Sequence, residues 1–249
     1  LHAFDADKIT GRKVVVRAAA EGEKFVTLDG VERLLSSSNL MICNEKESMC
    51  IAGVFGGIRS GITGNTRNIF IESAFFNPAS IRKTSKQHGL KTDASFRFER
   101  GTDPDITIFA LKRAALLIQE VAGGKISSHI TDVYPSPVLP RKIAYHFNSA
   151  GALIGKNIGK AELKKILTSL NISIEKENEE SLDLSIPTFK VDVTREADVV
   201  EEVLRIYGYN HVDVPRKLSA SLSYFPKNDP DELLRSEEHT SELQSQFRI

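Results

Sequence analysis

Residues 71–78 read IESAFFNP, and residues 88–101 read HGLKTDASFRFERG. The first stretch carries one carboxylate, Glu72, inside an apolar segment that is typical of a strand, and the second stretch is dense in polar and charged side chains. An apolar segment rarely buries a charge that has no partner. Glu72 is therefore either paired structurally or placed to meet a ligand.

The segments around these stretches predict a strand-rich first half. Strands are expected at residues 14–16, 25–28, 40–43, 51–55 and 69–71. Asp29-Gly30 is typical of a tight turn between strands. Asn77-Pro78 is typical of the start of a helix, which we expect to run to Lys86.

A longer helix is predicted to begin at Asp103-Pro104 and to end at Gly123-Gly124. Apolar residues recur at helical spacing and form one face of this helix, namely Ile106, Phe109, Ala110, Ala114, Leu117, Ile118 and Val121. Prolines at positions 135, 137 and 140 then indicate a linker between two domains.

The pattern after the linker predicts a second, smaller unit that begins near Lys142. We expect a short amphipathic helix around residues 163–170 and a charged loop at residues 175–180. Apolar and polar residues alternate at 182–186, as in a strand, and a last helix is expected from about Thr194 to Tyr207.

The bulk composition excludes several classes of protein. The 249 residues are 41% hydrophobic and 27% charged, which is ordinary for a soluble globular protein with one or two domains. Cys43 and Cys50 form neither a disulfide framework nor a metal quartet, so we expect core thiols in a reducing, cytoplasmic compartment. No apolar stretch approaches the roughly 18 residues that a membrane span needs.

The formal net charge is zero, which gives no support to a strongly basic nucleic-acid surface. Basic residues nevertheless cluster locally, at Arg82, Lys83, Lys86, Lys91, Arg97 and Arg100. Such a cluster either contacts RNA or is a solvated face, and the second is the commoner case. We expect Ser95, Arg97, Glu99 and Arg100 to form buried ion pairs that shape their loop, rather than to take part in catalysis.

Several motifs together resemble one family. Residues 1–5 (LHAFD), 21–30 (EGEKFVTLDG), 53–57 (GVFGG) and 92–95 (TDAS) have the order and spacing of the editing (B3/B4) domain of the bacterial phenylalanine–tRNA ligase beta subunit. Residues 187–192 (PTFKVD) and 201–210 (EEVLRIYGYN) resemble the B5 domain of that subunit. The resemblance covers roughly residues 1 to 234.

The resemblance implies an α+β fold in which a mixed-sheet B3/B4 domain precedes a small α/β B5 domain. The expected boundaries are 1–134 for B3/B4, 135–141 for the linker, 142–214 for B5 and 215–234 for the start of a catalytic-like domain. The chain opens in mid-motif without an initiator Met, so we expect an N-terminally truncated B3/B4 domain. Residues 235–249 resemble one reading frame of a sequencing-adapter oligonucleotide and are expected to be a non-biological tail, the alternative being a polar terminus.

The resemblance also implies a function, the hydrolysis of tyrosine wrongly joined to tRNA(Phe). A hydrophobic pocket cannot strongly reject a substrate that merely adds a hydroxyl, so a second site is needed to hydrolyse the error. Glu72 is expected to accept the hydrogen bond of the phenol. Gly56 and Ala94 would leave room for the aromatic ring, while Thr92 and His2 would line the ester end, where His2 either orients water or is structural.

The last helix carries Asp198, Glu201 and Glu202 on one face, with Asp192 just before it. Clustered carboxylates suit Mg²⁺, but spacing alone favours a solvated face in which Glu201 pairs with Arg205. The resemblance favours the metal, because the four matching positions of the family bind a magnesium ion shared with the alpha subunit.

The expected partners are the alpha subunit, in an alpha2beta2 heterotetramer, and tRNA(Phe), with no membrane. ATP would be a substrate of the whole ligase that these residues do not bind, because the aminoacylation site lies on the alpha subunit. The chain alone is not expected to aminoacylate. The alternative function is a non-catalytic RNA- or protein-binding module of the same fold. A metal-dependent hydrolase built on the acidic helix ranks far behind, because no histidine lies near Asp198.

Overall fold

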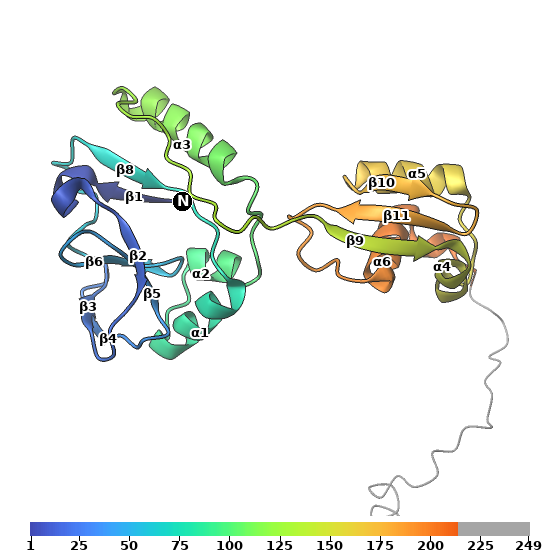
Figure 1. Cartoon of the computed structure of the whole chain (residues 1–249), viewed down its shortest axis with the longest axis horizontal. Helices are drawn as coiled ribbons and strands as arrows, with labels where there is room; N and C mark the ends of the chain where they lie inside the picture. Colours follow the sequence, from blue (N-terminus) through green and yellow to red (C-terminus); the bar gives the residue numbers. More distant parts are fainter. Residues whose placement is uncertain (214–249) are drawn as a thin grey trace, which may run out of the picture. The chain divides into compact units, whose positions relative to one another are not determined.

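The computed structural model describes residues 1–213. Eleven strands and six α-helices form in this part of the chain (Figure 1). The predicted catalytic-like segment at 215–234 and the predicted tail at 235–249 lie outside the described residues. None of the described helices is both long enough and apolar enough to cross a bilayer.

The strands have the following bounds: β1 His2–Asp5, β2 Val15–Ala18, β3 Lys24–Val26, β4 Glu32–Leu34, β5 Leu40–Cys43, β6 Ser48–Ile51, β7 Phe55–Gly56, β8 Ile69–Glu72, β9 Arg141–His146, β10 Ser173–Glu177 and β11 Ser181–Ile186. The helices are α1 Pro78–His88, α2 Asp93–Phe98, α3 Thr107–Ala122, α4 Phe147–Ile154, α5 Lys160–Ser169 and α6 Glu196–Tyr207. Three short 3-10 turns lie at Ala6–Lys8, Thr10–Arg12 and Tyr209–His211.

Antiparallel sheets organise the residues before the linker. The largest sheet has the order β2-β5-β6-β7, and β1 pairs with β8 and β3 with β4. β5 and β6 lie inside the main core, where Met41, Ile42 and Ile51 are almost inaccessible to solvent. Together with the helices, these sheets confirm the expected α+β class. The expected mixed sheet is wrong, because every pairing among the named strands of the described residues is antiparallel.

A tight turn separates β6 from β7, where the sequence pattern predicted one continuous strand. The expected strand at 51–55 is wrong, because Ala52, Gly53 and Val54 form the turn between β6 and β7. The backbone N–H of Val54 donates to the carbonyl of Ile51 at 3.0 Å, and Gly53 has φ +66°, a left-handed conformation that suits glycine. The expected Asp29-Gly30 turn is confirmed between β3 and β4, with Gly30 at φ +77°.

The α1 helix is fixed at both ends by local chemistry. The side chain of Asn77 accepts from the backbone N–H groups of Ala79 and Ser80, Pro78 occupies the first turn, and Gly89 ends the helix at φ +64°. The predicted helix start is confirmed, and the helix continues two residues beyond Lys86. α1 packs against α2.

The α3 helix differs from the prediction in two ways. It begins at Thr107, because the Asp103 carboxylate accepts from the backbone N–H of Asp105 and closes a turn before the helix. No residue of α3 is buried: Phe109 is 68% exposed and Val121 is 84% exposed. Helical spacing predicts that such residues share a face, but it does not predict what covers that face.

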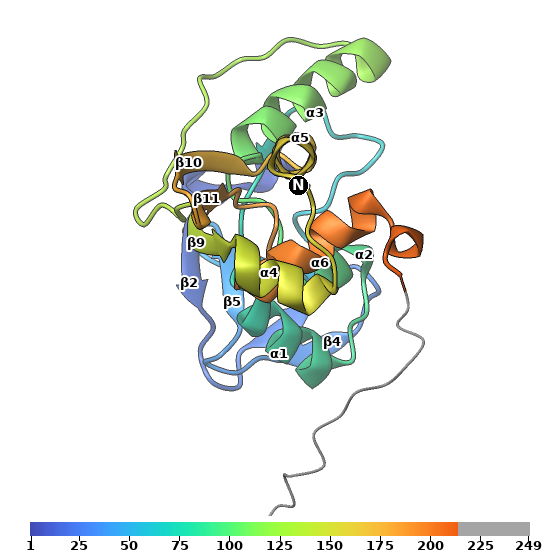
Figure 2. The same cartoon turned by 90° about the vertical axis from the view of Figure 1, so that its right-hand side faces the viewer.

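The residues after the linker form a second antiparallel sheet of order β10-β11-β9. α6 contacts α4, α5 and β9, and Figure 2 shows these three helices on one side of the sheet. The alternation predicted at 182–186 is confirmed, since Leu182, Leu184 and Ile186 are buried. The loop expected at 175–180 is partly wrong, because β10 extends to Glu177 and pairs with β11.

Candidate functional site

The β1–β8 pair brings two predicted site residues together. His2 lies directly opposite Glu72 in the antiparallel register. Directly opposed residues of an antiparallel pair place their side chains on the same face, with Cβ atoms about 4.5–5.5 Å apart. An imidazole and a carboxylate that are 70 positions apart in the sequence therefore project from one face of this sheet.

The Glu72 carboxylate is partly buried and has no partner. Within residues 1–213, no hydrogen bond and no cation within 4.0 Å engages it. Burial raises the pKa of Glu72 above its usual value. Burial, and then the charge of Glu72, raise the pKa of the Cys50 thiol. Glu72 was expected either to pair with a protein group or to meet a ligand. No such protein pairing is present among the described residues, which leaves the ligand.

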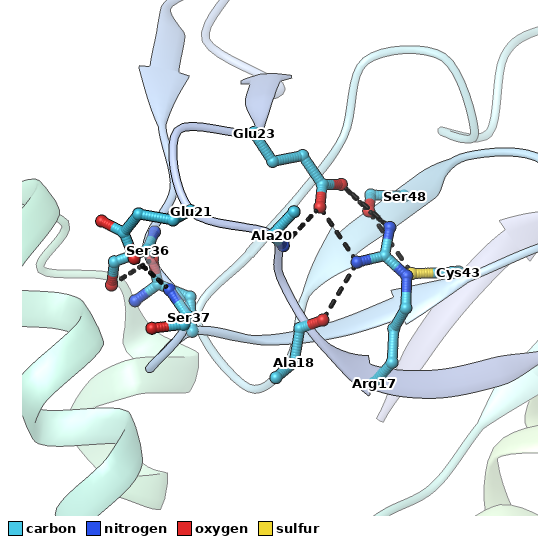
Figure 3. Close-up of polar contacts among 10 residues, drawn as sticks. Arg17, Ala18, Ala20, Glu21, Glu23, Ser36, Ser37, Cys43 and Ser48 are labelled. Carbon is cyan, nitrogen blue, oxygen red and sulfur yellow. Dashed lines mark hydrogen bonds and ion pairs between the residues drawn. The ribbon is translucent and has the colours of Figure 1, made fainter.

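Glu23 shows what a structurally used carboxylate looks like in the same molecule. Its two oxygens accept from Arg17 Nη1 at 2.9 Å and Arg17 Nη2 at 3.0 Å, and one also accepts from the backbone N–H of Ala20 (Figure 3). The Ser48 hydroxyl joins the same network. The Arg17 guanidinium holds the pKa of Glu23 at about 2. Glu23 is thus saturated, whereas Glu72 is not.

Gly56 leaves the space that the His2 ring occupies. A Cβ at position 56 would lie 2.8 Å from His2 Cε1 and 3.0 Å from Leu28 Cδ1, closer than such atoms approach one another. The His2 ring also packs against Phe4, with centroids 4.4 Å apart. Burial lowers the pKa of His2, which favours the neutral imidazole near pH 7. His2, Gly56 and Glu72 form one cluster, called here the Glu72 site.

Thr92 lies at the N-terminus of α2 and is tied to the same region. Its hydroxyl donates to the carbonyl of Val54 at 2.7 Å and accepts from the backbone N–H of Ser95 at 3.0 Å. Val54 directly precedes β7, which contains Gly56. The Thr92 proton is therefore committed to holding α2 against the site. Ala94 is exposed in the first turn of α2.

The polar residues of α2 do not form the buried ion pairs that we expected. Ser95 is buried and hydrogen-bonded to Thr92 and Leu90. Arg100 pairs with Glu99 at 3.0 Å, but its side chain is 54% exposed, and Arg97 is exposed as well. Arg97 in α2 and Arg100 just after it therefore both lie in solvent. Cys43 and Cys50 are buried free thiols, as predicted.

Sequence reasoning missed two neighbours of the site, Leu28 and Cys50. Leu28 lies against Gly56, and Cys50 is the register partner of Gly56 across β6 and β7. No sequence pattern distinguished these residues: strand register places Cys50 opposite Gly56, and the close approach of its side chain places the exposed Leu28 there.

The acidic face of α6 is largely occupied by local partners. The Asp198 carboxylate accepts from the backbone N–H groups of Thr194 and Arg195 and from both of their side chains. These bonds lower the pKa of Asp198 to about 2. Asp198 thus serves the start of the helix.

Glu202 pairs with Lys190 and, at 2.8 Å, with Arg205. The expected pairing of Arg205 with Glu201 is therefore wrong, and Glu201 and Asp192 are exposed. In the described residues, no three His, Cys, Asp or Glu side chains are arranged to hold a metal ion. The arrangement gives no support to a metal site formed by these residues alone, and the magnesium assignment to Asp192, Asp198, Glu201 and Glu202 stays a prediction.

Two family models match the chain. The B3/4 domain matches residues 1–123, and the tRNA synthetase B5 domain matches residues 143–209. The Glu72 site lies wholly in the first match. The chain belongs to the phenylalanine–tRNA ligase beta subunit family. A relative with that name from Bacteroides fragilis is 52% identical over 223 residues, which is 90% of this chain and 27% of the relative.

The same name belongs to other relatives. The protein from Bacteroides thetaiotaomicron is 50% identical over 95% of this chain, and the protein from Geobacter metallireducens is 46% identical over 86%. The chain spans 27% to 29% of the length of these relatives. A crystal structure of an N-terminal fragment of the phenylalanyl-tRNA synthetase beta-subunit from Pyrococcus horikoshii aligns over 84% of this chain and 59% of that chain. Its sequence identity to this chain is 20% and the TM-score is 0.45.

Proposed function

We propose that the Glu72 site hydrolyses the ester of tyrosine wrongly attached to tRNA(Phe). The observation that carries the proposal is the Glu72 carboxylate, which is partly buried and unpaired among the described residues. A partly buried carboxylate that no protein group engages keeps its lone pairs available to accept a hydrogen bond from a ligand. The phenol hydroxyl of tyrosine supplies the missing hydrogen bond, whereas phenylalanine leaves the carboxylate desolvated and unpaired.

The selectivity follows from this asymmetry. A site built to hydrogen-bond a hydroxyl strongly rejects the analogue that lacks it, because its buried polar group is then left unsatisfied. Glu72 therefore favours tyrosine over phenylalanine, the reverse of the preference needed for aminoacylation. Correctly charged tRNA is spared, and the mischarged product is removed.

The chemistry needs no nucleophile from the protein. A water molecule attacks the ester carbonyl, and the neutral imidazole of His2 accepts its proton. The bond between the acyl carbon and the ribose oxygen then breaks, and the imidazolium returns the proton to that oxygen, so that tyrosine and uncharged tRNA leave. Gly56 keeps the His2 ring in place by leaving room beside it. Thr92 holds the start of α2 against the loop before β7. Its hydroxyl proton is committed to Val54, so Thr92 contributes a lone pair and a boundary to the site.

We also propose that the complete protein works with an alpha subunit in an alpha2beta2 assembly that joins phenylalanine to tRNA(Phe). Membership of the beta subunit family supports this proposal. ATP and Mg²⁺ would serve that assembly. The Glu72 site would act on its erroneous product in the cytoplasm.

The test is single-turnover hydrolysis of preformed Tyr-tRNA(Phe) and Phe-tRNA(Phe) by the complete ligase carrying this sequence in its beta subunit. A hydrogen bond to a charged group contributes about 1.5–3 kcal/mol, so Glu72→Ala should slow Tyr-tRNA hydrolysis about 10- to 150-fold. Glu47→Ala, at an exposed surface pair, is the matched control. An active ligase that hydrolyses neither substrate would instead support a non-catalytic binding module.

A further inference from the structure

A flat, exposed pair of side chains lies at the end of α2. The guanidinium carbon of Arg100 is 3.6 Å from the centroid of the Phe96 ring. Arg100 Nη1 donates to the backbone carbonyl of Phe96 at 2.8 Å and to Glu99 Oε1 at 3.0 Å, which fixes the guanidinium over the ring. Phe96 is nevertheless 57% exposed. The Phe96–Arg100 pair is therefore an ordered π surface that faces solvent.

Positive charge surrounds this pair. Residues 78–101 contain six basic and two acidic residues, although the chain as a whole has zero net charge. All six basic side chains are exposed: Arg82, Lys83, Lys86, Lys91, Arg97 and Arg100. Within residues 1–213, Arg100 alone among them has a carboxylate within 4.0 Å. Most of this charge is thus free to meet a polyanion.

The pair is linked to the Glu72 site through one turn of helix. The backbone N–H of Phe96 donates to the carbonyl of Thr92 at 2.9 Å, and Thr92 bonds to Val54 beside β7. One helical turn advances about 5.4 Å along the axis. Phe96 therefore lies one helical turn after Thr92, which is tied to the turn before β7, and Gly56 of the Glu72 site is in β7.

Single-stranded nucleic acid has this combination of features. Proteins that bind it combine basic grooves along the backbone with aromatic side chains or guanidinium planes on which bases stack. We propose that the Phe96–Arg100 pair and the basic side chains of α1 and α2 bind the single-stranded 3′ end of the tRNA. A base that precedes the terminal adenosine stacks on the pair. This inference rests on the proposed hydrolysis at the Glu72 site.

The test compares two substrates of the complete ligase, Tyr-tRNA(Phe) and 3′-O-tyrosyl-adenosine, which lacks the preceding nucleotides. Stacking contributes about 1–3 kcal/mol per base, so Phe96→Ala should lower kcat/KM for Tyr-tRNA about 5- to 150-fold. The loss should appear in KM, while hydrolysis of tyrosyl-adenosine stays unchanged. Phe96→Tyr keeps the ring and should behave as wild type. Phe189→Ala removes another exposed phenylalanine with a cation nearby and is the matched control.

A second readout isolates the charge. Each phosphate contact to a single strand contributes about 0.7 to the slope of log affinity against log salt, so Lys83→Ala/Lys86→Ala should reduce that slope by about 1.4. Lys112→Ala/Arg113→Ala, on exposed residues of α3, should leave the slope unchanged.

Two results would overturn the inference. The first is an unchanged KM for Tyr-tRNA in Phe96→Ala. The second is an equal loss of kcat/KM for Tyr-tRNA and for tyrosyl-adenosine, which would make Phe96 part of the Glu72 site. Failure of the hydrolysis proposal is recognised separately, because the wild type would then hydrolyse neither substrate. In that case filter binding of uncharged tRNA(Phe) decides. A dissociation constant about 5- to 150-fold weaker for Phe96→Ala supports the inference, and an equal constant overturns it.

Discussion

At the scale of single residues, the unpaired Glu72 carboxylate makes a prediction about stability. Because burial raises the pKa of Glu72, the folded state binds a proton at this group more readily than the unfolded state does. The stability from this group is fully present below its unfolded pKa and is lost as pH rises through its folded pKa. Glu72→Gln should therefore have a higher Tm than wild type at neutral pH, and the difference should vanish towards about pH 4. Thermal unfolding across this pH range measures it.

Glu23 provides the control with the opposite sign. Its pKa is lowered to about 2, so its contribution is present above the unfolded pKa and is lost as pH falls towards that value. Glu23→Gln should lower the Tm at neutral pH. Equal Tm values for Glu72→Gln and wild type at neutral pH would mean that Glu72 has a partner after all.

Gly56 makes a second prediction. The Cβ of Gly56→Ala would meet the His2 ring at 2.8 Å, so the ring must move. Overpacking of this kind costs about 1–3 kcal/mol of stability. We expect Tyr-tRNA hydrolysis to slow by up to about 10²- to 10⁴-fold, the contribution of a positioned general base, because His2 is displaced. Gly64→Ala, where a Cβ would meet nothing within 4 Å, is the control for both rate and Tm. Wild-type hydrolysis by Gly56→Ala would separate His2 from the reaction.

The sequence predicts part of this site but not its chemistry. The motifs around His2, Gly56 and Glu72 predict one site, and the structure places His2 opposite Glu72 and against Gly56. The absence of a partner for Glu72 among the described residues depends on where every nearby side chain points. That information is in the fold, and no spacing rule contains it.

At the scale of elements, Thr92 holds the N-terminus of α2. Thr92→Val keeps the shape but loses both hydroxyl bonds, and the loss of an N-cap costs about 0.5–2 kcal/mol. Thr92→Ser keeps both bonds and should retain the wild-type Tm and hydrolysis rate. Thermal unfolding and hydrolysis of both variants make the comparison. A full loss of hydrolysis in Thr92→Ser would indicate that the threonine methyl group contacts substrate.

Two variants on α6 distinguish a carboxylate with a structural role from one that binds a metal ion. Asp198→Ala should lower the Tm by a few degrees whether or not Mg²⁺ is present, because Asp198 bonds to Thr194 and Arg195. Glu201→Ala changes an exposed residue and should leave the Tm unchanged without Mg²⁺. Thermal unfolding with Mg²⁺ and with a chelator tests the predicted ligands. A Mg²⁺-dependent rise in the Tm of wild type that Glu201→Ala abolishes would assign the ion to this helix.

Elements were predictable where one local rule determined them. Asn77-Pro78 and Gly89 bound α1, and strict alternation marks β11. The errors lie where side chains act at a distance: the Asp103 carboxylate delays α3, and pairing with β11 extends β10 into a charged segment. The apolar residues of α3 share a face, but their exposure follows from the surrounding fold.

At the scale of the whole molecule, the α+β class and the family follow from motif order, while the site depends on segments far apart in the sequence. β1, β7 and β8 supply the three residues of the Glu72 site, and α2 is tied to them by a single hydroxyl. Net charge is a poor guide at this scale, because zero net charge coexists with a basic stretch at residues 78–101.

The most direct measurement is a crystal structure of the complete ligase with a stable amide analogue, 3′-tyrosylamino-3′-deoxyadenosine. Hydrogen bonds between a hydroxyl and a carboxylate oxygen are about 2.5–3.0 Å long. We predict that the phenol oxygen lies within this distance of a Glu72 carboxylate oxygen, with the His2 ring at the amide end. A tyrosine bound elsewhere, or bound here with its hydroxyl in solvent and Glu72 paired to a protein group, would contradict the central claim.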